Sequence, residues 1–135
     1  MVGVKRVVRR RANEYQWIVE ELETRSTFTA KAMMGCELIG LNGLQRLVLA
    51  DKAEPWRGLL VCTNRDQHES LCREFKSLRP HPVLGKWLYL SAACDDFEST
   101  ALALADLVLR ADSRIGVESK PRKRAAVGAR ARRVK

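Results

Sequence analysis

Long hydrophobic runs are missing from this chain of 135 residues. A membrane-spanning helix needs about 20 mainly apolar residues, and no stretch of even about 18 occurs. The arginine-rich first residues are not followed by the apolar segment of about 7–15 residues that marks a secretory signal. We therefore expect a cytoplasmic protein that does not enter a membrane. Its composition, 46% hydrophobic and 30% charged, is typical of a globular domain.

Cysteine and histidine are scarce, with four and two residues respectively. No C-x-x-C pair occurs, so we expect reduced thiols that pack as small apolar residues. The best candidate for a metal site is His68 and Cys72, four residues apart on an expected helix, with Cys62 just upstream. A structural zinc site takes four closely spaced ligands, and no fourth ligand is near. The sequence therefore predicts no metal and no cofactor.

Signatures of catalysis are also missing. The glycines lack the spacing of a phosphate-binding loop, and no G-x-S-x-G nucleophile elbow occurs. His81 lies between two prolines, where we expect an exposed loop position rather than a general base. The adjacent Asp95 and Asp96 are better explained as the N-cap of a helix. The sequence therefore predicts neither an enzyme nor a small-molecule substrate.

Aromatic residues make up only 6% of the chain, and most of them fall on apolar stripes that predict core positions. Trp56 is the exception, because it follows Pro55 in a polar link and precedes Arg57. It is either a lid over the core or an exposed contact residue, since aromatic side chains are enriched at binding surfaces.

Positive charge is concentrated at the two ends of the chain. The net charge is +9, of which residues 1–11 carry +5 and residues 117–135 carry +7, so residues 12–116 carry −3. This distribution predicts a basic N-terminal arm (1–11), a mildly acidic domain (12–116) and a basic tail (117–135). The tail is rich in Ala, Gly and Arg without apolar periodicity, which predicts disorder.

Basic arms bind polyanions by releasing counterions, a mechanism without sequence preference. We therefore expect the arms to contact nucleic acid. The expected contact residues are Arg9, Arg10, Arg11, Lys120, Arg122, Lys123, Arg124, Arg130, Arg132 and Arg133. In the alternative interpretation the arms only keep the protein soluble. The domain would then be a protein–protein interaction module or a small homodimer that uses its sheet edge.

A β-hairpin is the clearest local signal. Asn42-Gly43 joins two apolar runs, residues 36–41 and 44–50, and this dipeptide suits the two positive-φ positions of a type I′ turn.

The remaining elements follow from hydrophobic periodicity. Apolar runs of strand length occur at residues 57–63 and 86–91. Apolar residues three or four apart predict helices over residues 13–23 and 64–78, and from about 95 to 113. This order indicates an α+β domain with a single antiparallel or mixed sheet of four or five strands, flanked by about three helices.

Several of these segments resemble the N-terminal domain of the TfoX/Sxy family. The likeness rests on Thr29–Gly35, Asn42-Gly43, Leu59–Val61, Arg79–Pro82 and Gly85–Leu90. It covers about residues 13–115, and the related YjbR-like domains share the same order of helices and strands. This sequence has Met34 where the family usually has Phe, and Cys36 where it usually has a second Gly.

The resemblance implies an α+β sandwich without a known catalytic site. It also implies a part in the transcriptional regulation of DNA uptake, or a related regulatory contact. The positions that match the family pattern, which we expect to be structural, are Met33, Gly35, Asn42, Gly43, Gly85 and Trp87. Together with the basic arms, this predicts a small non-catalytic regulatory protein that contacts nucleic acid and docks a protein partner through its acidic domain.

Overall fold

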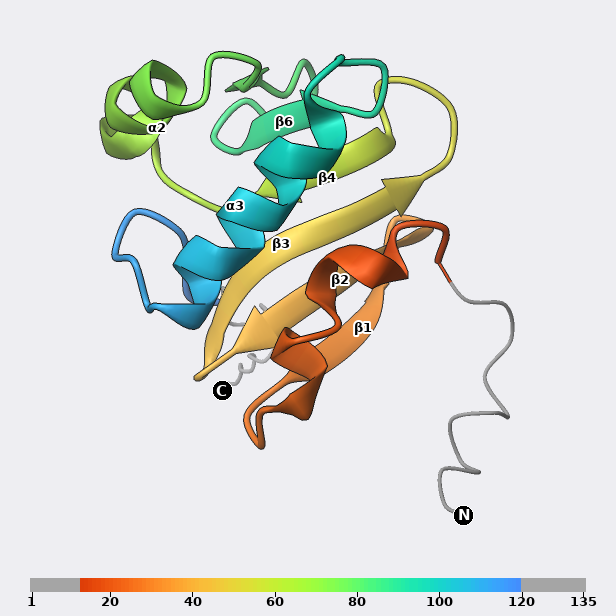
Figure 1. Ribbon diagram of the computed structural model, residues 1–135, viewed down its shortest axis with the longest axis vertical. Coiled ribbons are helices and arrows are strands. Elements are labelled where there is room, and N and C mark those ends of the chain that lie inside the picture. The colour runs from red at the N-terminus through yellow and green to blue at the C-terminus, as the bar shows by residue number, and fades with distance from the viewer. Residues whose placement is uncertain (1–12, 120–135) are drawn as a thin grey trace, which may run out of the picture.

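An antiparallel sheet of six strands organises residues 13–119, the part of the chain that the computed structural model describes (Figure 1). Its strand order is β1-β2-β3-β4-β6-β5, with antiparallel neighbours throughout. The strands are β1 (Thr29–Met33), β2 (Cys36–Leu41), β3 (Leu44–Asp51), β4 (Arg57–Val61), β5 (Arg79–Pro80) and β6 (Leu88–Ser91). The predicted α+β class is confirmed, but the sheet has six strands where four or five were expected.

Two tight turns build the first half of the sheet. The predicted hairpin is present, with Asn42 and Gly43 at φ of 55° and 82° between β2 and β3. A second turn of this kind, Met34-Gly35 with φ of 50° and 82°, joins β1 to β2. The sequence does not predict β1, because its side chains are exposed along most of the strand and show no apolar alternation.

The far edge of the sheet also differs from the prediction. Arg79-Pro80, expected as a helix-terminating loop, forms the two-residue strand β5. Proline is tolerated there because an edge strand leaves one side of its backbone without ladder hydrogen bonds. Strand β6 therefore has a partner on each side, β4 and β5.

The first predicted helix is wrong in type. Residues 13–23 contain two short 3-10 helices, η1 (Gln16–Val19) and η2 (Leu22–Thr24), instead of one α-helix. The apolar residues occur in pairs three apart, Tyr15 with Ile18 and Val19 with Leu22, and all four are buried. The predicted apolar stripe is therefore buried, but the helix is interrupted at residues 20 and 21, between η1 and η2.

The other two predicted helices are present but shorter. Residues 64–78 contain the 3-10 helix η3 (Arg65–Gln67) and α2 (His68–Glu74), and α3 spans Phe97–Leu109. Asp96 lies at the N-cap position of α3 as expected, yet its carboxylate makes no capping bond to the backbone. It instead accepts hydrogen bonds from the hydroxyls of Ser77 and Thr100, at 2.7 and 3.0 Å, and these bonds lower its pKa.

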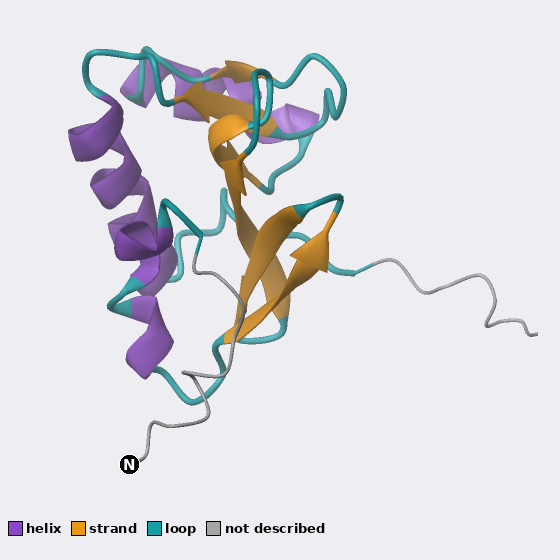
Figure 2. Cartoon of the chain, turned by 90° about the vertical axis from the view of Figure 1, so that its right-hand side faces the viewer, coloured by secondary structure: helices purple, strands orange, loops and turns teal. Residues whose placement is uncertain are grey.

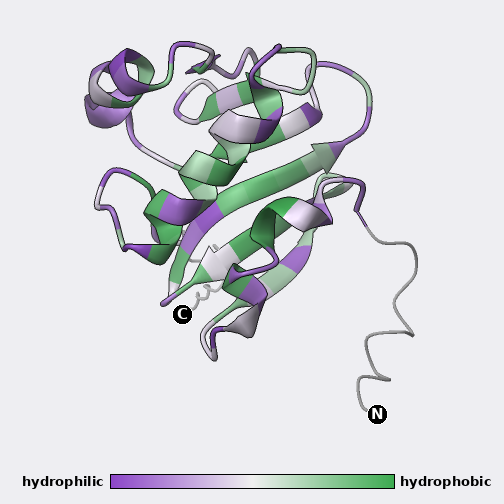
Figure 3. Cartoon of the chain, viewed as in Figure 1, coloured by the Kyte–Doolittle hydropathy of each residue, from purple (hydrophilic) through white to green (hydrophobic). Residues whose placement is uncertain are grey.

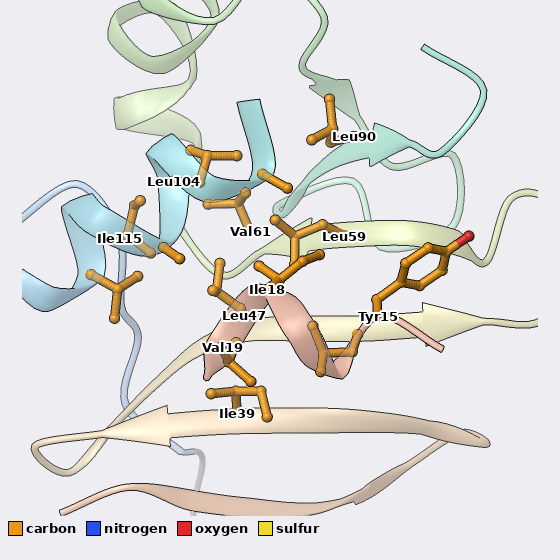
Figure 4. Close-up of a cluster of buried hydrophobic side chains, with 14 of the residues drawn as sticks. Tyr15, Ile18, Val19, Ile39, Leu47, Leu59, Val61, Leu90, Leu104 and Ile115 are labelled. Atoms are coloured by element: carbon orange, nitrogen blue, oxygen red, sulfur yellow. The ribbon is translucent and has the colours of Figure 1, made fainter. Parts of the chain in front are cut away.

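The main core lies between the sheet and its helices. In Figure 1, α3 and the η1–η2 segment lie in front of the strands, and the quarter turn of Figure 2 places them on one side of the sheet. Alternate residues of β3 and β4, such as Leu47, Leu59 and Val61, point into this layer and are fully buried (Figure 4). Figure 3 shows the corresponding hydrophobic band along these strands.

A second buried cluster occupies the opposite face of the sheet. Its members, which come from β2, β3, β4 and β6 and the residue after β4, are Cys36, Leu38, Val48, Ala50, Leu60, Cys62 and Tyr89. Partly buried side chains cover it, namely Met33, Trp56, Leu84, Trp87 and Val117. The central strands are therefore buried on both faces, and segments without regular secondary structure supply much of the cover on this side.

Two glycines with positive φ should respond differently to alanine. At Gly43, nothing lies within 4 Å of the position that a Cβ would take, so only backbone strain of about 1 kcal/mol is expected. At Gly58, with φ of 146°, the Cβ would clash with the carbonyl oxygen of Leu90, and we expect Gly58→Ala to cost at least about 3 kcal/mol. Urea unfolding of both variants measures the difference, and equal losses would contradict the close packing of β4 against β6.

Candidate binding groove on the open sheet face

A groove of about 1440 Å³ opens on the sheet face that carries the second cluster. Strand β1 and the Met34 turn contribute one set of lining residues, and the loop of residues 83–87 contributes another. The start of β3 and residues 116–119 complete the lining. Its apolar residues are Met33, Met34, Leu44, Val83, Leu84, Trp87 and Val117.

Three exposed cations line the groove. Lys31 lies on β1, two residues before Met33, while Arg65 begins η3 and Lys86 precedes β6. The Arg65 guanidinium packs against Gly85, because a Cβ at that glycine would lie 3.3 Å from its Nη2. None of the three cations forms an ion pair within residues 13–119. Among the described lining residues only Glu118 is acidic, so the groove has an excess of positive charge.

A fourth cation lies buried beside the groove. Arg46 is only 4% exposed, and its Nε and Nη1 donate to the carbonyl oxygens of Leu41 and Ile115 at 3.0 and 2.7 Å. Burial lowers its pKa, but a guanidinium whose ordinary pKa exceeds about 12 stays charged. Gly116, which lines the groove, packs directly on Nη1. A buried positive charge with only carbonyl partners strengthens the positive potential of the groove.

Cations on the helical side of the domain are arranged differently. Arg73 pairs with Glu69 and Arg110 with Asp106, each at 2.8 Å and one helical turn apart. Arg114 bonds Asp112, Glu74 and the Ser70 hydroxyl, which raises the pKa of Arg114 and lowers that of Asp112. Residues 13–119 together carry a net charge of −4. The three groove cations therefore differ from these paired arginines and share the absence of an ion pair with Arg25, Lys52, Lys76 and Arg79, but within the described residues only the groove brings three such cations to one concave site.

His81 holds the loop that forms one side of the groove. The sequence predicted an exposed position for His81, but its side chain is buried and only 1% exposed. Its Nδ1 accepts the backbone N–H groups of Val83 and Leu84, both at 3.1 Å. Its Nε2 therefore carries the proton and donates to the Pro55 carbonyl at 2.7 Å. The ring packs against Trp56 at 4.4 Å between centroids. His81 thus serves as a structural anchor, and Trp56 matches the interpretation as a lid.

Tyr89 and Glu54 fix the neighbouring loop. The Tyr89 hydroxyl lies 2.7 Å from the Glu54 carboxylate, to which it donates, and it accepts the backbone N–H of Arg57 at 2.8 Å. The Arg57 carbonyl is also 2.8 Å away, but the single proton favours the charged acceptor. Burial, together with the bond to Glu54, raises the pKa of Tyr89. Ser91 donates to the second Glu54 oxygen at 2.6 Å. The loop before β4 is therefore tied to β6.

The start of the basic tail is attached to the sheet at the groove. Val117 forms a bridge with Gln45, in which each backbone N–H donates to the other's carbonyl, at 2.8 and 3.0 Å. The Gly116 N–H donates to the Cys62 carbonyl at 2.8 Å. Glu118 and Ser119 then line the groove, and Lys120 follows directly in the sequence.

The predicted site residues divide into two groups. The arm and tail cations, Arg9, Arg10, Arg11, Lys120, Arg122, Lys123, Arg124, Arg130, Arg132 and Arg133, lie outside the described residues. Of the family-pattern positions, Met33, Gly85 and Trp87 line the groove, while Gly35, Asn42 and Gly43 lie in the two tight turns. Sequence reasoning did not identify Lys31, Arg65 and Lys86, because positions so far apart along the chain meet only through strand pairing.

The side chains considered for metal binding do not come together. No group of three or more His, Cys, Asp or Glu side chains within residues 13–119 is placed to hold a metal ion. His68 Nε2 lies 2.8 Å from the Lys86 carbonyl, and the Cys72 thiol contacts the Leu78 carbonyl at 3.5 Å. All four cysteines are free thiols.

Comparison of the chain with models of known families, with curated proteins and with solved structures finds no match. The resemblance to the TfoX/Sxy and YjbR-like domains therefore stays a prediction. In the described part of the chain, no helix has the length and apolar character that crossing a bilayer requires.

Replacing His81 should loosen the side of the groove that it anchors. His81→Ala leaves two backbone N–H groups and the Pro55 carbonyl without their partner, and we expect a loss of about 2–4 kcal/mol in the free energy of unfolding. His68→Ala is the matched control and should cost less than about 1.5 kcal/mol, because it removes one hydrogen bond near the surface. Similar losses in urea unfolding would show that His81 is not the anchor.

Buried thiols should make the domain less stable at alkaline pH. Burial raises the pKa of Cys62 well above its ordinary value and raises those of Cys36 and Cys72. The unfolded chain then ionises first as the pH rises, so these groups favour folding below about pH 8.5 and lose that effect above it. We expect the unfolding free energy to fall by up to about 1.4 kcal/mol per pH unit for each fully shifted thiol. Cys62→Ala should reduce the slope between pH 8.5 and 10, and an unchanged slope would contradict this account.

Proposed function

We propose that the protein is a small, non-catalytic nucleic-acid-binding protein whose groove and basic tail bind the same polyanion. The proposal includes a regulatory role in the cytoplasm, which the resemblance to the TfoX/Sxy domains motivates. Its main support is that the cations of the groove and the start of the positively charged tail lie at the same place. The groove holds Lys31, Arg65 and Lys86 without ion pairs in the described chain, and the segment leading to the tail lines the same groove.

The distribution of charge favours the groove over the rest of the domain surface as the place where a polyanion binds. Residues 13–119 carry −4 overall, so much of the domain surface repels a polyanion. Residues 120–135 carry eight Lys/Arg and no acidic residue, and in the sequence they follow Ser119, which lines the groove. A polyanion held by the tail would therefore lie near a groove that offers three further cations without ion pairs in residues 13–119.

Salt-titrated binding of a fluorescent oligonucleotide tests the proposal. The groove variant Lys31→Gln/Arg65→Gln/Lys86→Gln removes three positive charges, each worth about 0.7 in the log–log salt slope on a single strand. We expect its slope to fall by about 2 and its affinity at 150 mM salt to fall by about one to two orders of magnitude. Deletion of residues 120–135 should flatten the slope further, because it removes eight charges.

The matched control is Arg25→Gln/Lys76→Gln/Arg79→Gln, which removes the same charge from exposed positions that do not line the groove. Its affinity should stay within about threefold of the unmodified protein, since cations away from the phosphates contribute only through screened, long-range attraction. Equal losses in the two triple variants would show that net charge alone matters. No binding at moderate salt by the unmodified protein would refute the proposal.

The unpaired edge of β1 favours a second candidate, an interaction module or homodimer. Strand β1 pairs only with β2 among the described strands and exposes four of its five residues. Lys31 lies at the centre of this edge, however, and charged residues at such positions discourage strand-to-strand association. A dimer at micromolar concentration in analytical ultracentrifugation, abolished by Ala30→Pro, would favour this candidate.

A further inference from the structure

The lining of the groove is more apolar than phosphate binding alone requires. Met34 and Val83, on opposite sides of the groove, are 62% and 60% exposed. They are two of the three large hydrophobic residues in residues 13–119 that are prominently exposed, and the third, Leu102, lies on α3. Trp87 lines the groove between Lys86 and the buried start of β6. Exposed apolar side chains that gather at one concave site indicate a ligand with an apolar part.

The cations stand at the two ends of the strand order. Lys31 is on the edge strand β1, while Arg65 and Lys86 belong to the segments beside β6. Lys31 shares its side of the groove with Met33 and Met34, and Lys86 shares its side with Val83 and Trp87. A chain that crosses the groove therefore meets both positive charge and apolar side chains on each side. A groove that combines cations for the backbone with an aromatic side chain for the bases is the usual solution for single-stranded nucleic acid.

A duplex fits these features poorly. It presents phosphates outward and keeps its bases stacked inside, so its bases would not contact Val83, Met34 or the part of Trp87 that lines the groove. A single strand can turn its bases toward these side chains while its phosphates face the lysines and the arginine. An acidic polypeptide could satisfy the charges, but it offers a planar ring only where an aromatic residue occurs, whereas every nucleotide of a single strand carries one.

We propose that this groove binds single-stranded nucleic acid in preference to duplex, with bases packed on Trp87 and against Val83. This inference rests on the proposed nucleic-acid-binding function and adds the form of nucleic acid that is recognised.

The test uses the full chain and two probes, a labelled 15-nucleotide oligothymidylate and a 15-base-pair duplex, both followed by fluorescence anisotropy at 150 mM salt. We expect the oligothymidylate to bind at least about tenfold more tightly. Val83→Glu adds one negative charge in the groove, and Leu102→Glu adds the same charge at another exposed apolar position, on α3. Val83→Glu should weaken oligothymidylate binding at least about tenfold, and Leu102→Glu less than about threefold.

Trp87 provides an independent readout. Trp87→Leu should weaken oligothymidylate binding about 5- to 100-fold, the range expected for loss of one stacked base, with little effect on duplex binding. Binding of oligothymidylate should quench the tryptophan fluorescence of the unmodified protein, and Trp87→Phe should remove most of this quenching. Thermal unfolding of each variant checks that the domain is intact, and Val83→Glu keeps the test decisive if a Trp87 variant fails to fold.

Several results would overturn the inference. Equal affinity for the two probes, or equal weakening by Val83→Glu and Leu102→Glu, would leave nucleic-acid binding in place but remove the role of the groove in selecting single strands. Displacement of oligothymidylate by polyglutamate of equal length at equal concentration would show that the groove recognises charge only. Failure of the unmodified protein to bind either probe would instead refute the proposed function itself.

Discussion

The two-sided burial of strand β3 is the constraint on which the rest of the structure depends. Leu47 and Leu49 face the helices, while Val48 and Ala50 face the opposite side, and all four are fully buried. A strand that is apolar on both faces must be covered twice. The helices cover one face, so the domain has to cover the other with loops and with the segment that follows α3.

Polar anchors make this irregular cover stable. The loop lacks the backbone hydrogen bonds of a paired strand. The His81 ring replaces them with hydrogen bonds to backbone atoms of Pro55, Val83 and Leu84. Arg46 holds the Ile115 carbonyl, and the pairing of Val117 with Gln45 continues the sheet beyond the end of β4. The cover does not extend over the area between β1 and the loop of residues 83–87. The groove is this remaining area, and it combines three cations that form no ion pair within residues 13–119 with Met34 and Val83, two prominently exposed hydrophobic residues.

The sequence predicts the elements whose signals are local. The Asn42-Gly43 hairpin, the strands within residues 57–63 and 86–91, and α3 all follow from turn chemistry or apolar periodicity within a single segment. Strands β1 and β5 have no such signal, because pairing with a neighbour rather than a buried face defines them. The first helix shows the limit of periodicity, since the apolar residues between 15 and 22 are buried as predicted while the segment folds as two 3-10 helices.

The candidate site was predictable only in part. Met33, Gly85 and Trp87 were singled out for a family resemblance, not as lining residues of a groove. His81 is buried by the Trp56 and Tyr89 rings and by backbone groups of Pro55, Val83 and Leu84, none of which its flanking prolines reveal, so the expectation of an exposed position was wrong. Basic charge at the chain ends was visible in the composition, but the attachment of the C-terminal segment beside the groove depends on the pairing of residues 45 and 117.

Backbone amide shifts of the full chain, recorded by NMR during titration with the 15-nucleotide oligothymidylate, test the central claim most directly. The account predicts that the largest shifts in the folded domain fall on residues 83–87, on residues 31–34 and on residues 116–119, with α3 nearly unchanged. Shifts confined to residues outside this domain, or centred on α3 and the η1–η2 segment, would show that the groove is not the binding surface.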